Sequence, residues 1–172
     1  ARSEYPVDDK RKEKISIFCN IKKENVISAP DIKSIYEVPL NFEKENLSEK
    51  ILKRFNLKPK KKDLKDWKKL IEVIRHPKRK VKIGIAGKYF RTGKFTLMDS
   101  YISVIEAVKH ASFCFRAQPE IIWFDTEEYE KKSGERKLNE LRELQGVIVP
   151  GGFGKRGIKG KIKVIQFCRE HK

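Results

Sequence analysis

The sequence lacks any long apolar run. No stretch approaches the roughly 18 consecutive apolar residues that a membrane-spanning helix requires. The segment 1–14 (ARSEYPVDDKRKEK) has neither an initiator methionine nor the apolar centre of a secretory signal peptide. These absences predict a cytoplasmic protein with no membrane partner, and we expect its true start to lie upstream of Ala1.

The chain is also poor in cysteine. Its three cysteines, Cys19, Cys114 and Cys168, are odd in number and far apart, and each has apolar neighbours. Disulfide frameworks and zinc sites show even counts or close, regular spacing. We therefore predict three buried free thiols in a reducing compartment, and no metal site in this chain.

Acidic residues are outnumbered by basic ones. The chain has 41 Lys and Arg against 24 Asp and Glu, a formal net charge of +17, and clustered cations favour binding to a nucleic-acid backbone. Only Lys58–Lys62 and Lys78–Lys80 are dense basic runs, whereas the other charges alternate in sign as on a solvated helix face. No zinc-finger spacing, aromatic RNA-binding signature or helix-turn-helix is found. We therefore expect no nucleic-acid partner, and a heat-adapted surface explains the charge equally well.

The first block, residues 1–57, is predicted to be mainly helical around one short strand. Acidic residues at positions 8 and 9 begin a helix that ends near Asn20, and its apolar residues at helical spacing are Ile15, Phe18 and Cys19. A strand is expected at Val26–Ser28. Asp31 is placed to cap the segment DIKSIYEV, and Leu47–Phe55 forms an amphipathic helix opened by Ser48.

Residues 58–80 are predicted to connect two domains. Pro59 and the four lysines of Lys58–Asp63 supply stiffness and mutual repulsion without an apolar anchor. A helix opened by Asp63 and Asp66 follows and ends before Pro77. Its apolar residues form one stripe, consisting of Leu64, Trp67, Leu70, Ile71 and Ile74.

From Val81 onward, strands and helices alternate. Strands are expected at 81–87, 120–124 and 146–150, and the first intervening helix carries Tyr101, Val104, Ile105 and Val108 on one face. Strands separated by helices pair in parallel through right-handed crossovers. We therefore predict an α/β fold for 81–172, with an incomplete Rossmann-like or flavodoxin-like sheet covered on both faces. Ligands should lie beyond the carboxyl ends of its strands.

A glycine-rich turn follows the third of these strands. Residues 146–160 read GVIVPGGFGKRGIKG, an apolar run that breaks at Pro150 and leads into a helix carrying Ile162 and Ile165. Gly151 and Gly152 can hold a positive φ and allow a ligand to approach the main chain, and the helix behind them favours negative charge at its first turn. The turn is therefore predicted to bind an anion or a developing oxyanion.

A dinucleotide site is the main alternative for this turn. Gly152, Gly154 and Gly157 match G-x-G-x-x-G between a strand and a helix. However, they follow the third strand instead of the first, and the chain ends before any acidic residue about 20 positions on could bind a ribose. No nucleophile with a neighbouring base is visible either, so the residues alone predict an α/β domain with an anion or oxyanion site.

Five segments of the chain resemble the CTP synthase family, in order and at matching separations. They span the junction between the synthetase and glutamine amidotransferase domains of that family: ISIFCN, VISAPDIKSIYEVPL, VKIGIAGKY, DSYISVIEAVKHA and IVPGGFGKRGIKGK. The resemblance implies that 1–57 is the C-terminal part of an α/β synthetase domain. It further implies that 58–80 is a linker and helix, and that 81–172 is the N-terminal part of a class I glutamine amidotransferase domain.

The resemblance implies a ligase that converts UTP to CTP. In this family ATP phosphorylates the uracil O4, and ammonia released from glutamine displaces that phosphate. Mg²⁺ and ATP are required, GTP activates and CTP inhibits, and the enzyme is a homotetramer that can form filaments. The family's P-loop, Mg²⁺ ligands and catalytic Cys, His and Glu have no counterpart between Ala1 and Lys172, so this chain alone is expected to be inactive.

In the synthetase part, the resemblance assigns nucleotide contacts to six residues. Lys14 corresponds to a lysine at the UTP and CTP site, and Phe18 to an aromatic contact for CTP, although a core residue on an apolar stripe remains an equal alternative for Phe18. The ATP contacts are Arg2, Pro30, Asp31 and Ile32.

In the amidotransferase part, the resemblance identifies Gly151 and Gly152 as oxyanion-hole glycines, with Gly152 contacting glutamine. Arg156 and Gly157 match the segment that covers this site and responds to GTP, whereas Lys159 stands where the family commonly has Glu. Another class I amidotransferase fused to a different synthetase would explain the glycines but not SAPDIKSIYEVPL. A basic nucleic-acid-binding domain is the remaining alternative.

Overall fold

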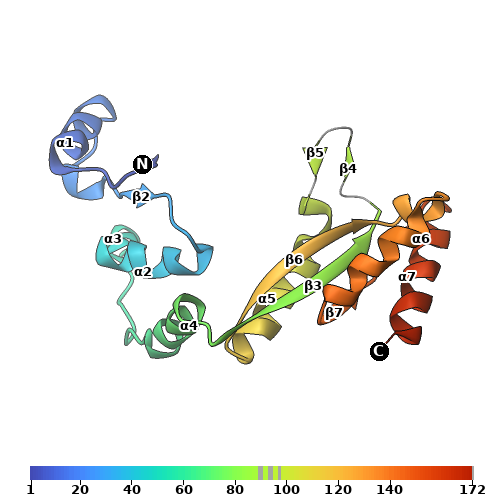
Figure 1. Ribbon diagram of the computed structural model, residues 1–172. Helices are drawn as coiled ribbons and strands as arrows, with labels where there is room; N and C mark the ends of the chain where they lie inside the picture. Colours follow the sequence, from blue (N-terminus) through green and yellow to red (C-terminus); the bar gives the residue numbers. More distant parts are fainter. Residues whose placement is uncertain (89–90, 93–94, 97, 172) are drawn as a thin grey trace. The chain divides into compact units, whose positions relative to one another are not determined.

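The computed structural model describes residues 1–88, 91–92, 95–96 and 98–171. The chain divides into two compact units, Ala1–Glu72 and Val73–Lys172 (Figure 1). The first is mainly helical, and the second contains a three-stranded parallel sheet with helices. The α/β fold class expected for residues 81–172 is therefore confirmed.

The first unit contains short helices and one pair of two-residue strands. Its elements are β1 (Arg2–Ser3), α1 (Asp9–Phe18), η1 (Lys23–Asn25), β2 (Ala29–Pro30), η2 (Ile35–Glu37), α2 (Val38–Lys44), α3 (Leu47–Arg54) and the start of α4 (Lys65–Arg75). The Asp8 carboxylate caps α1 by accepting the amide of Arg11 at 2.8 Å. The predicted start of this helix is thus confirmed, and Asn20 follows its end in the left-handed conformation.

Three local predictions for the first unit are wrong. The strand lies at Ala29–Pro30 rather than Val26–Ser28, because it pairs in parallel with β1 there. Asp31 caps no helix, since its carboxylate is bound to Arg2 and its amide donates to Ser3. Ser48 lies inside α3, whose N-cap is Asn46.

The helix predicted after residue 62 is present as α4. The Asp63 side chain accepts the amide of Lys65 at 3.0 Å, which supports the predicted N-terminal signal. Ile71 is buried, and the Trp67 indole donates to the Tyr36 carbonyl at 2.8 Å. Residues 57–64, immediately before the helix, form no regular secondary structure.

The cysteine prediction is only half correct. All three thiols are free, as expected. They are not buried, however, because Cys19 and Cys114 are exposed and Cys168 is partly exposed. Cys19 lies at the C-cap of α1 and Cys114 in the last turn of α5, where apolar sequence neighbours do not ensure burial.

The second unit is built on the parallel sheet. Its strands are β3 (Arg79–Gly87), β6 (Ala117–Asp125) and β7 (Gly146–Ile148), and its longer helices are α5 (Ile102–Cys114) and α7 (Ile158–Glu170). The shorter elements are β4 (Arg91–Thr92), β5 (Phe95–Thr96), η3 (Met98–Tyr101), η4 (Glu128–Glu130), α6 (Gly134–Lys137) and η5 (Leu138–Glu143). The antiparallel pair of β4 and β5 has no counterpart in the sequence prediction.

The strand order is β6-β3-β7, so the first strand of the unit lies between the other two. This order corresponds to the 2-1-3 start of a flavodoxin-like sheet, whereas a classical Rossmann half places its first strand at the edge of such a triplet. The register pairs Ile85 with Trp123 and with Ile148. The sequence prediction left both arrangements open, and the structure has the flavodoxin-like one.

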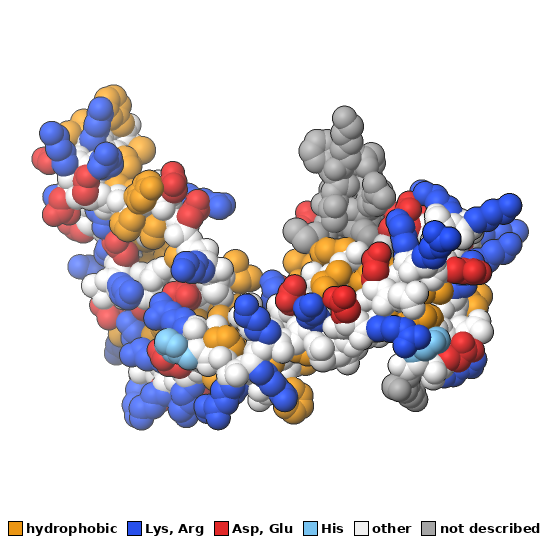
Figure 2. All heavy atoms as spheres, in the orientation of Figure 1, with side chains coloured by type: hydrophobic (Ala, Val, Ile, Leu, Met, Phe, Trp, Pro, Cys, Tyr) orange, Lys and Arg blue, Asp and Glu red, His pale blue; other side chains and the backbone are white. Residues whose placement is uncertain are grey.

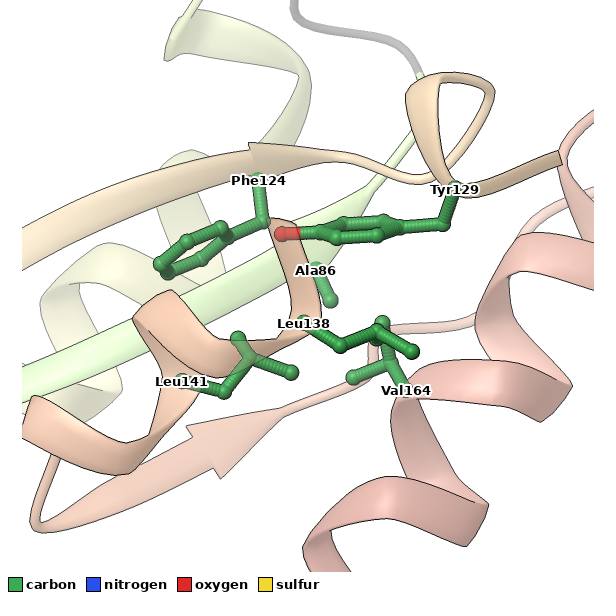
Figure 3. Close-up of a cluster of buried hydrophobic side chains, with 6 residues drawn as sticks. All are labelled: Ala86, Phe124, Tyr129, Leu138, Leu141 and Val164. Carbon is green, nitrogen blue, oxygen red and sulfur yellow. The ribbon is translucent and has the colours of Figure 1, made fainter. Parts of the chain in front are cut away.

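Both faces of the sheet are covered in the second unit. On one face Trp123 lies near Tyr101, with ring centroids 6.5 Å apart, and α5 supplies Ile105 and Val108 to the buried layer. On the other face six buried side chains converge from β3, β6, η4, η5 and α7: Ala86, Phe124, Tyr129, Leu138, Leu141 and Val164 (Figure 3). Burial raises the pKa of Tyr129 far above its usual range, which keeps this core phenol neutral.

The surface charges are mixed rather than segregated. Figure 2 shows basic and acidic side chains interspersed over the face in view. Several form ion pairs, such as Lys12 with Glu45 and Lys109 with Glu106, each at 2.7 Å. Within the described residues, no helix is both long and apolar enough to cross a membrane.

Candidate functional site

The glycine-rich turn lies beyond the carboxyl end of β7. In the observed strand order, the crossover from β3 to β6 runs in one direction and that from β6 to β7 in the other, so the order reverses between β3 and β7. In open parallel sheets, ligands bind outside the strand ends at this reversal. The fold therefore places residues 149–157 at the position where a ligand site is expected.

The carboxyl ends of β3 and β6 are joined by hydrogen bonds. Thr126, immediately after β6, donates to the Gly87 carbonyl through its amide at 2.9 Å and its hydroxyl at 3.1 Å. The Lys88 amide donates to the Tyr101 hydroxyl at 3.1 Å. These buried contacts make the end of β3 a fixed support for the turn after β7.

Lys88 connects that support to the turn. Although its side chain carries a charge, the residue is only 3% exposed. Its ammonium group donates to the carbonyl oxygens of Phe153 and Gly154, the latter at 2.8 Å. Burying a charge is costly unless polar groups surround it, so the two carbonyls are part of what holds Lys88 in place.

Lys161 holds the beginning of the same turn. From the first turn of α7, its ammonium group donates to the Pro150 carbonyl at 2.5 Å and lies 3.3 Å from the Gly151 carbonyl. Burial, reinforced by the nearby charge of Lys88, lowers the pKa of Lys161. The carbonyl groups of Pro150, Gly151, Phe153 and Gly154 thus all face cations.

The amides of Gly151 and Gly152 point away from Lys161. The peptide units of the described residues are all trans, and in a trans unit the carbonyl and the following N–H point in opposite directions. Within the described part of the chain, neither amide donates a hydrogen bond. Apart from its own chain neighbours, no heavy atom lies within 4 Å of the position that a Gly151 Cβ would occupy, so the turn is not packed around Gly151.

The predicted positive φ angles fall on other glycines. Gly154 and Gly157 have φ of +77° and +73°, whereas Gly151 and Gly152 are not in the left-handed region. Gly157 is also confined, since an added Cβ would lie 2.7 Å from the Thr126 hydroxyl. The reversal of the chain therefore occurs later in the turn than expected.

The N-terminus of α7 binds an anion from within the chain. The amides of Lys159 and Gly160 donate to one Glu130 carboxylate oxygen, at 3.1 and 3.4 Å. Gly160 also packs so tightly on Thr126 that a Cβ would lie 1.7 Å from its carbonyl oxygen. The helix end therefore offers no room for a pyrophosphate, and the predicted contribution of α7 to anion binding is met by Glu130 instead of a ligand.

Arg156 and Gly157, the residues matched to the covering segment, lie against the same strand ends. The Arg156 guanidinium donates to the Lys88 carbonyl at 3.3 Å and pairs with Glu127 at 2.8 Å. Gly157 is buried beside Lys88 and forms the N-cap of α7. Both are thus built into the connection between the turn and the ends of β3 and β6.

A groove in the first unit brings three of the other candidate residues together. It has a volume of about 910 Å³ and is lined by residues of the N-terminal strand and α1, including Arg2, Lys14 and Phe18. Phe18 is 80% exposed. Within the described chain Phe18 is therefore not part of a core.

The remaining candidates adjoin this groove through Arg2. Its guanidinium pairs with the Asp31 carboxylate at 3.3 Å, and β1 pairs with β2 so that Ser3 lies opposite Pro30. Ile32 follows Asp31 and is partly exposed. Arg2 is thus a neighbour of the consecutive residues 30–32, although 29 sequence positions separate it from Asp31.

Sequence reasoning missed the three residues that hold the turn. Lys88, Lys161 and Glu130 act through contacts over 65, 11 and 29 sequence positions, respectively. A lysine directly after an apolar strand, and another on the helix face that carries buried Val164, were the available signals. Neither signal specifies a partner, since the carbonyl acceptors are backbone atoms.

Comparisons with known proteins match both parts of the chain. A family model described as CTP synthase N-terminus matches residues 1–57, and one described as class I glutamine amidotransferase matches residues 96–172. The N-terminal match favours a CTP synthase over an amidotransferase fused to a different synthetase.

Full-length relatives are similar over almost the whole chain. The CTP synthase of Carboxydothermus hydrogenoformans is 44% identical over 172 residues, covering 100% of this chain and 31% of its own length. The CTP synthase of Methanococcus maripaludis is 41% identical, with 98% of this chain and 31% of the relative covered. The chain therefore spans less than a third of the length of these relatives.

A solved structure, the glutaminase domain of Trypanosoma brucei CTPS with bound acivicin, is 32% identical. The match covers 53% of this chain and 33% of the other, with a TM-score of 0.46. Taken together, the two family models in this order and the relatives similar across both units identify the family: the chain belongs to the CTP synthases.

Proposed function

We propose that this chain contributes to the ATP-dependent conversion of UTP to CTP, with glutamine as the nitrogen donor. Residues 1–57 are assigned to the synthetase domain, 58–80 to a linker and helix, and 81–172 to the amidotransferase domain. Residues outside this segment are proposed to supply the nucleophile, its base and the P-loop. The chain by itself is therefore expected to be inactive.

The observation that carries this proposal is the geometry of the turn after β7. The carbonyls of Pro150 and Gly151 face Lys161, so the Gly151 and Gly152 amides of the same trans peptide units point away from it. Fixed N–H donors are what an amide carbonyl needs when attack by a nucleophile turns its oxygen into an oxyanion. Because these donors are fixed beforehand, they stabilise the developing charge without reorganising.

In the proposed reaction, the glutamine side-chain carbonyl binds with its oxygen directed at the two glycine amides. Attack on the carbonyl carbon converts this oxygen to an oxyanion, and the hydrogen bonds from Gly151 and Gly152 strengthen as charge develops. Loss of one such donor costs about 10²–10³ in rate in comparable sites. Collapse of the tetrahedral intermediate releases ammonia, which the synthetase part uses.

The groove in the first unit is proposed to bind pyrimidine nucleotides. The Lys14 ammonium would pair with the phosphates of UTP or CTP, and the exposed Phe18 ring would stack on the base of CTP. Arg2, Pro30, Asp31 and Ile32 would contact ATP, with the Arg2–Asp31 pair fixing the two strands against each other.

Mg²⁺ is proposed as a cofactor of the reaction and would neutralise phosphate charge. The described residues contain no group of three or more His, Cys, Asp or Glu side chains able to hold a metal ion. The residues of this segment thus do not fit a metal site of their own, and no step of the reaction is assigned to a metal bound by them.

Regulation and assembly are proposed by analogy with the family. Arg156 and Gly157 would transmit activation by GTP to the turn, because both contact the strand ends that support it. CTP would inhibit from the pyrimidine groove. We further propose a homotetramer, able to form filaments, in the cytoplasm.

Replacement of Gly152 by leucine tests the proposal in the full-length polypeptide. A bulky side chain beside the amide donors should abolish CTP synthesis with glutamine and leave synthesis with ammonium chloride within about twofold of the wild type. CTP formation from UTP and ATP is followed with each nitrogen source. Absence of CTP formation by the wild type with either source would refute the proposed activity, and equal loss of both in the variant would refute the oxyanion role.

A further inference from the structure

We propose that Lys161 is a positioning residue for the oxyanion site, because its ammonium group fixes the two peptide units whose N–H groups face the ligand. This inference rests on the proposed function, since it concerns the same turn. No sequence signal assigned Lys161 to the site, and its role emerges only from its contacts.

Each carbonyl that Lys161 binds shares a planar peptide unit with one of the two glycine amides. The Pro150 carbonyl belongs to the same planar unit as the Gly151 amide, and the Gly151 carbonyl to the same unit as the Gly152 amide. Lys161 binds both of these carbonyls, at 2.5 and 3.3 Å. One side chain thus determines the direction of both amides that are assigned to the oxyanion.

Glycine makes such a constraint necessary. Gly151 has no neighbouring heavy atom within 4 Å of its missing Cβ, so packing does not restrict its rotation. A glycine peptide unit is the one most able to adopt other orientations. Without the ammonium group, the carbonyl oxygen could turn toward the ligand and present a negative dipole to the oxyanion.

The location of Lys161 supports a role beyond attachment of the helix. Burial and the nearby Lys88 ammonium group both disfavour the positive charge on Lys161, and they therefore lower the pKa of Lys161. Two cations that repel each other are held at one turn, and between them they bind four of its carbonyl groups. Such an arrangement costs stability, and it concentrates positive potential behind the amides that face the ligand.

A merely structural role is the competing explanation. In that case Lys161 would attach the turn to α7, and its loss would lower protein stability or all activities together. A positioning role predicts a selective effect on the transition state for glutamine hydrolysis, because the amide donors act most strongly on the oxyanion.

The test uses Lys161→Met in the full-length polypeptide, with Lys163→Met as the matched control on the same helix. For Lys161→Met we expect kcat for glutamine hydrolysis to fall about 10- to 100-fold. This decrease is no larger than the decrease in kcat caused by removal of one oxyanion donor. The KM for glutamine and ammonia-dependent CTP synthesis should each stay within about twofold of the wild type. Lys163→Met should match the wild type in all three measurements.

Two further measurements separate positioning from folding. Lys161→Arg keeps a cationic donor and should recover most of the lost kcat, which identifies the charge-assisted bonds as the cause. The aldehyde glutamate γ-semialdehyde forms a tetrahedral adduct with a nucleophile, so its affinity should fall in proportion to kcat/KM, while the affinity for glutamate stays constant.

The outcomes distinguish this inference from the proposed function. If the wild type hydrolyses glutamine and Lys161→Met does so equally well, the positioning role is refuted and the proposed function stands. Equal losses of glutamine- and ammonia-dependent synthesis, or no recovery in Lys161→Arg, would also overturn it. A wild type without either activity refutes the proposed function itself.

Discussion

At the scale of single residues, the glycines of the site have different physical reasons to be glycine. Gly160 is required by packing, because the Thr126 carbonyl occupies the position of a Cβ, and Gly157 by both packing and its positive φ. Gly151 is required by neither. A glycine that the fold does not need is best explained by access for a ligand.

This contrast predicts stability effects of very different size for two alanine substitutions. Gly160→Ala should lower the free energy of unfolding by about 3 kcal/mol, because its Cβ would overlap a backbone oxygen that cannot move freely. Gly151→Ala should change it by less than about 0.5 kcal/mol. Urea unfolding of both variants measures the difference, and equal destabilisation would mean that Gly151 is also a structural glycine.

The parts of the site formed by consecutive residues could be predicted from the sequence, whereas the parts formed by contacts between distant residues could not. The glycine turn was found because Pro150, Gly151 and Gly152 are consecutive after an apolar strand. The positive φ angles considered possible at Gly151 and Gly152 occur at Gly154 and Gly157 instead, because the local sequence does not show where in the turn the chain reverses. The two lysines were missed because their partners are backbone carbonyls reached only after folding.

At the scale of elements, the N-terminus of α7 depends on a residue from another element. Ordinary capping residues precede their helix by a few positions, but here Gly157 occupies the N-cap and has no side chain to accept a bond. Glu130 from η4 supplies the carboxylate instead. The helix start and the segment after β6 are therefore stabilised together.

Removal of this remote cap should destabilise the second unit. We expect Glu130→Ala to lower the free energy of unfolding by about 1 kcal/mol, as for loss of a cap with a favourable charge at a helix N-terminus. The matched control is Glu143→Ala, whose 3.7 Å pair with Lys82 is solvent-exposed and should contribute less than about 0.5 kcal/mol. Thermal or urea unfolding compares the two, and equal values would contradict the capping role.

Element prediction succeeded where the pattern is long. The elements β3, β6, α5 and α7 have apolar residues repeated over several turns or pleats, and all four are present. The two-residue strand at Ala29–Pro30 was misplaced because its position is set by pairing with Arg2–Ser3. The spacing of apolar residues along the sequence gives no information about this pairing. Strand order was undecided for the same reason.

At the scale of the whole molecule, the chain divides into two units, Ala1–Glu72 and Val73–Lys172, and the first unit contains a stretch without regular secondary structure. Residues 57–63 are exposed and have no regular secondary structure. The contact between Lys62 and Glu43 involves one side chain at the end of this stretch. The boundary proposed from composition, within 58–80, stays a prediction.

Limited trypsin digestion tests that boundary. The first cleavage should follow Lys60, Lys61 or Lys62, because extended exposed segments enter a protease site without prior unfolding. Mass spectrometry of early fragments locates the cut, and replacement of these three lysines by glutamine should slow it strongly. First cleavage within α5 or β6 in the wild type would contradict the proposed organisation.

At this scale, some of the basic residues that contribute to the net charge of +17 have partners within the chain. Many lysines pair with nearby carboxylates, and two of them serve the turn after β7. An overall excess of one sign keeps a protein soluble but says little about its fold. The positions of individual charged residues are therefore more informative about function than the net charge.

The binding of carbonyl groups by Lys161 also determines how the turn can change state. A planar peptide unit rotates as a whole, so breaking one lysine bond and turning the unit over would replace an N–H donor by an oxygen at the same place. The negative end of a carbonyl dipole would then point in the direction that the N–H group now takes. Loss of a bond from Lys161 is therefore expected to reverse the polarity that this side of the turn presents.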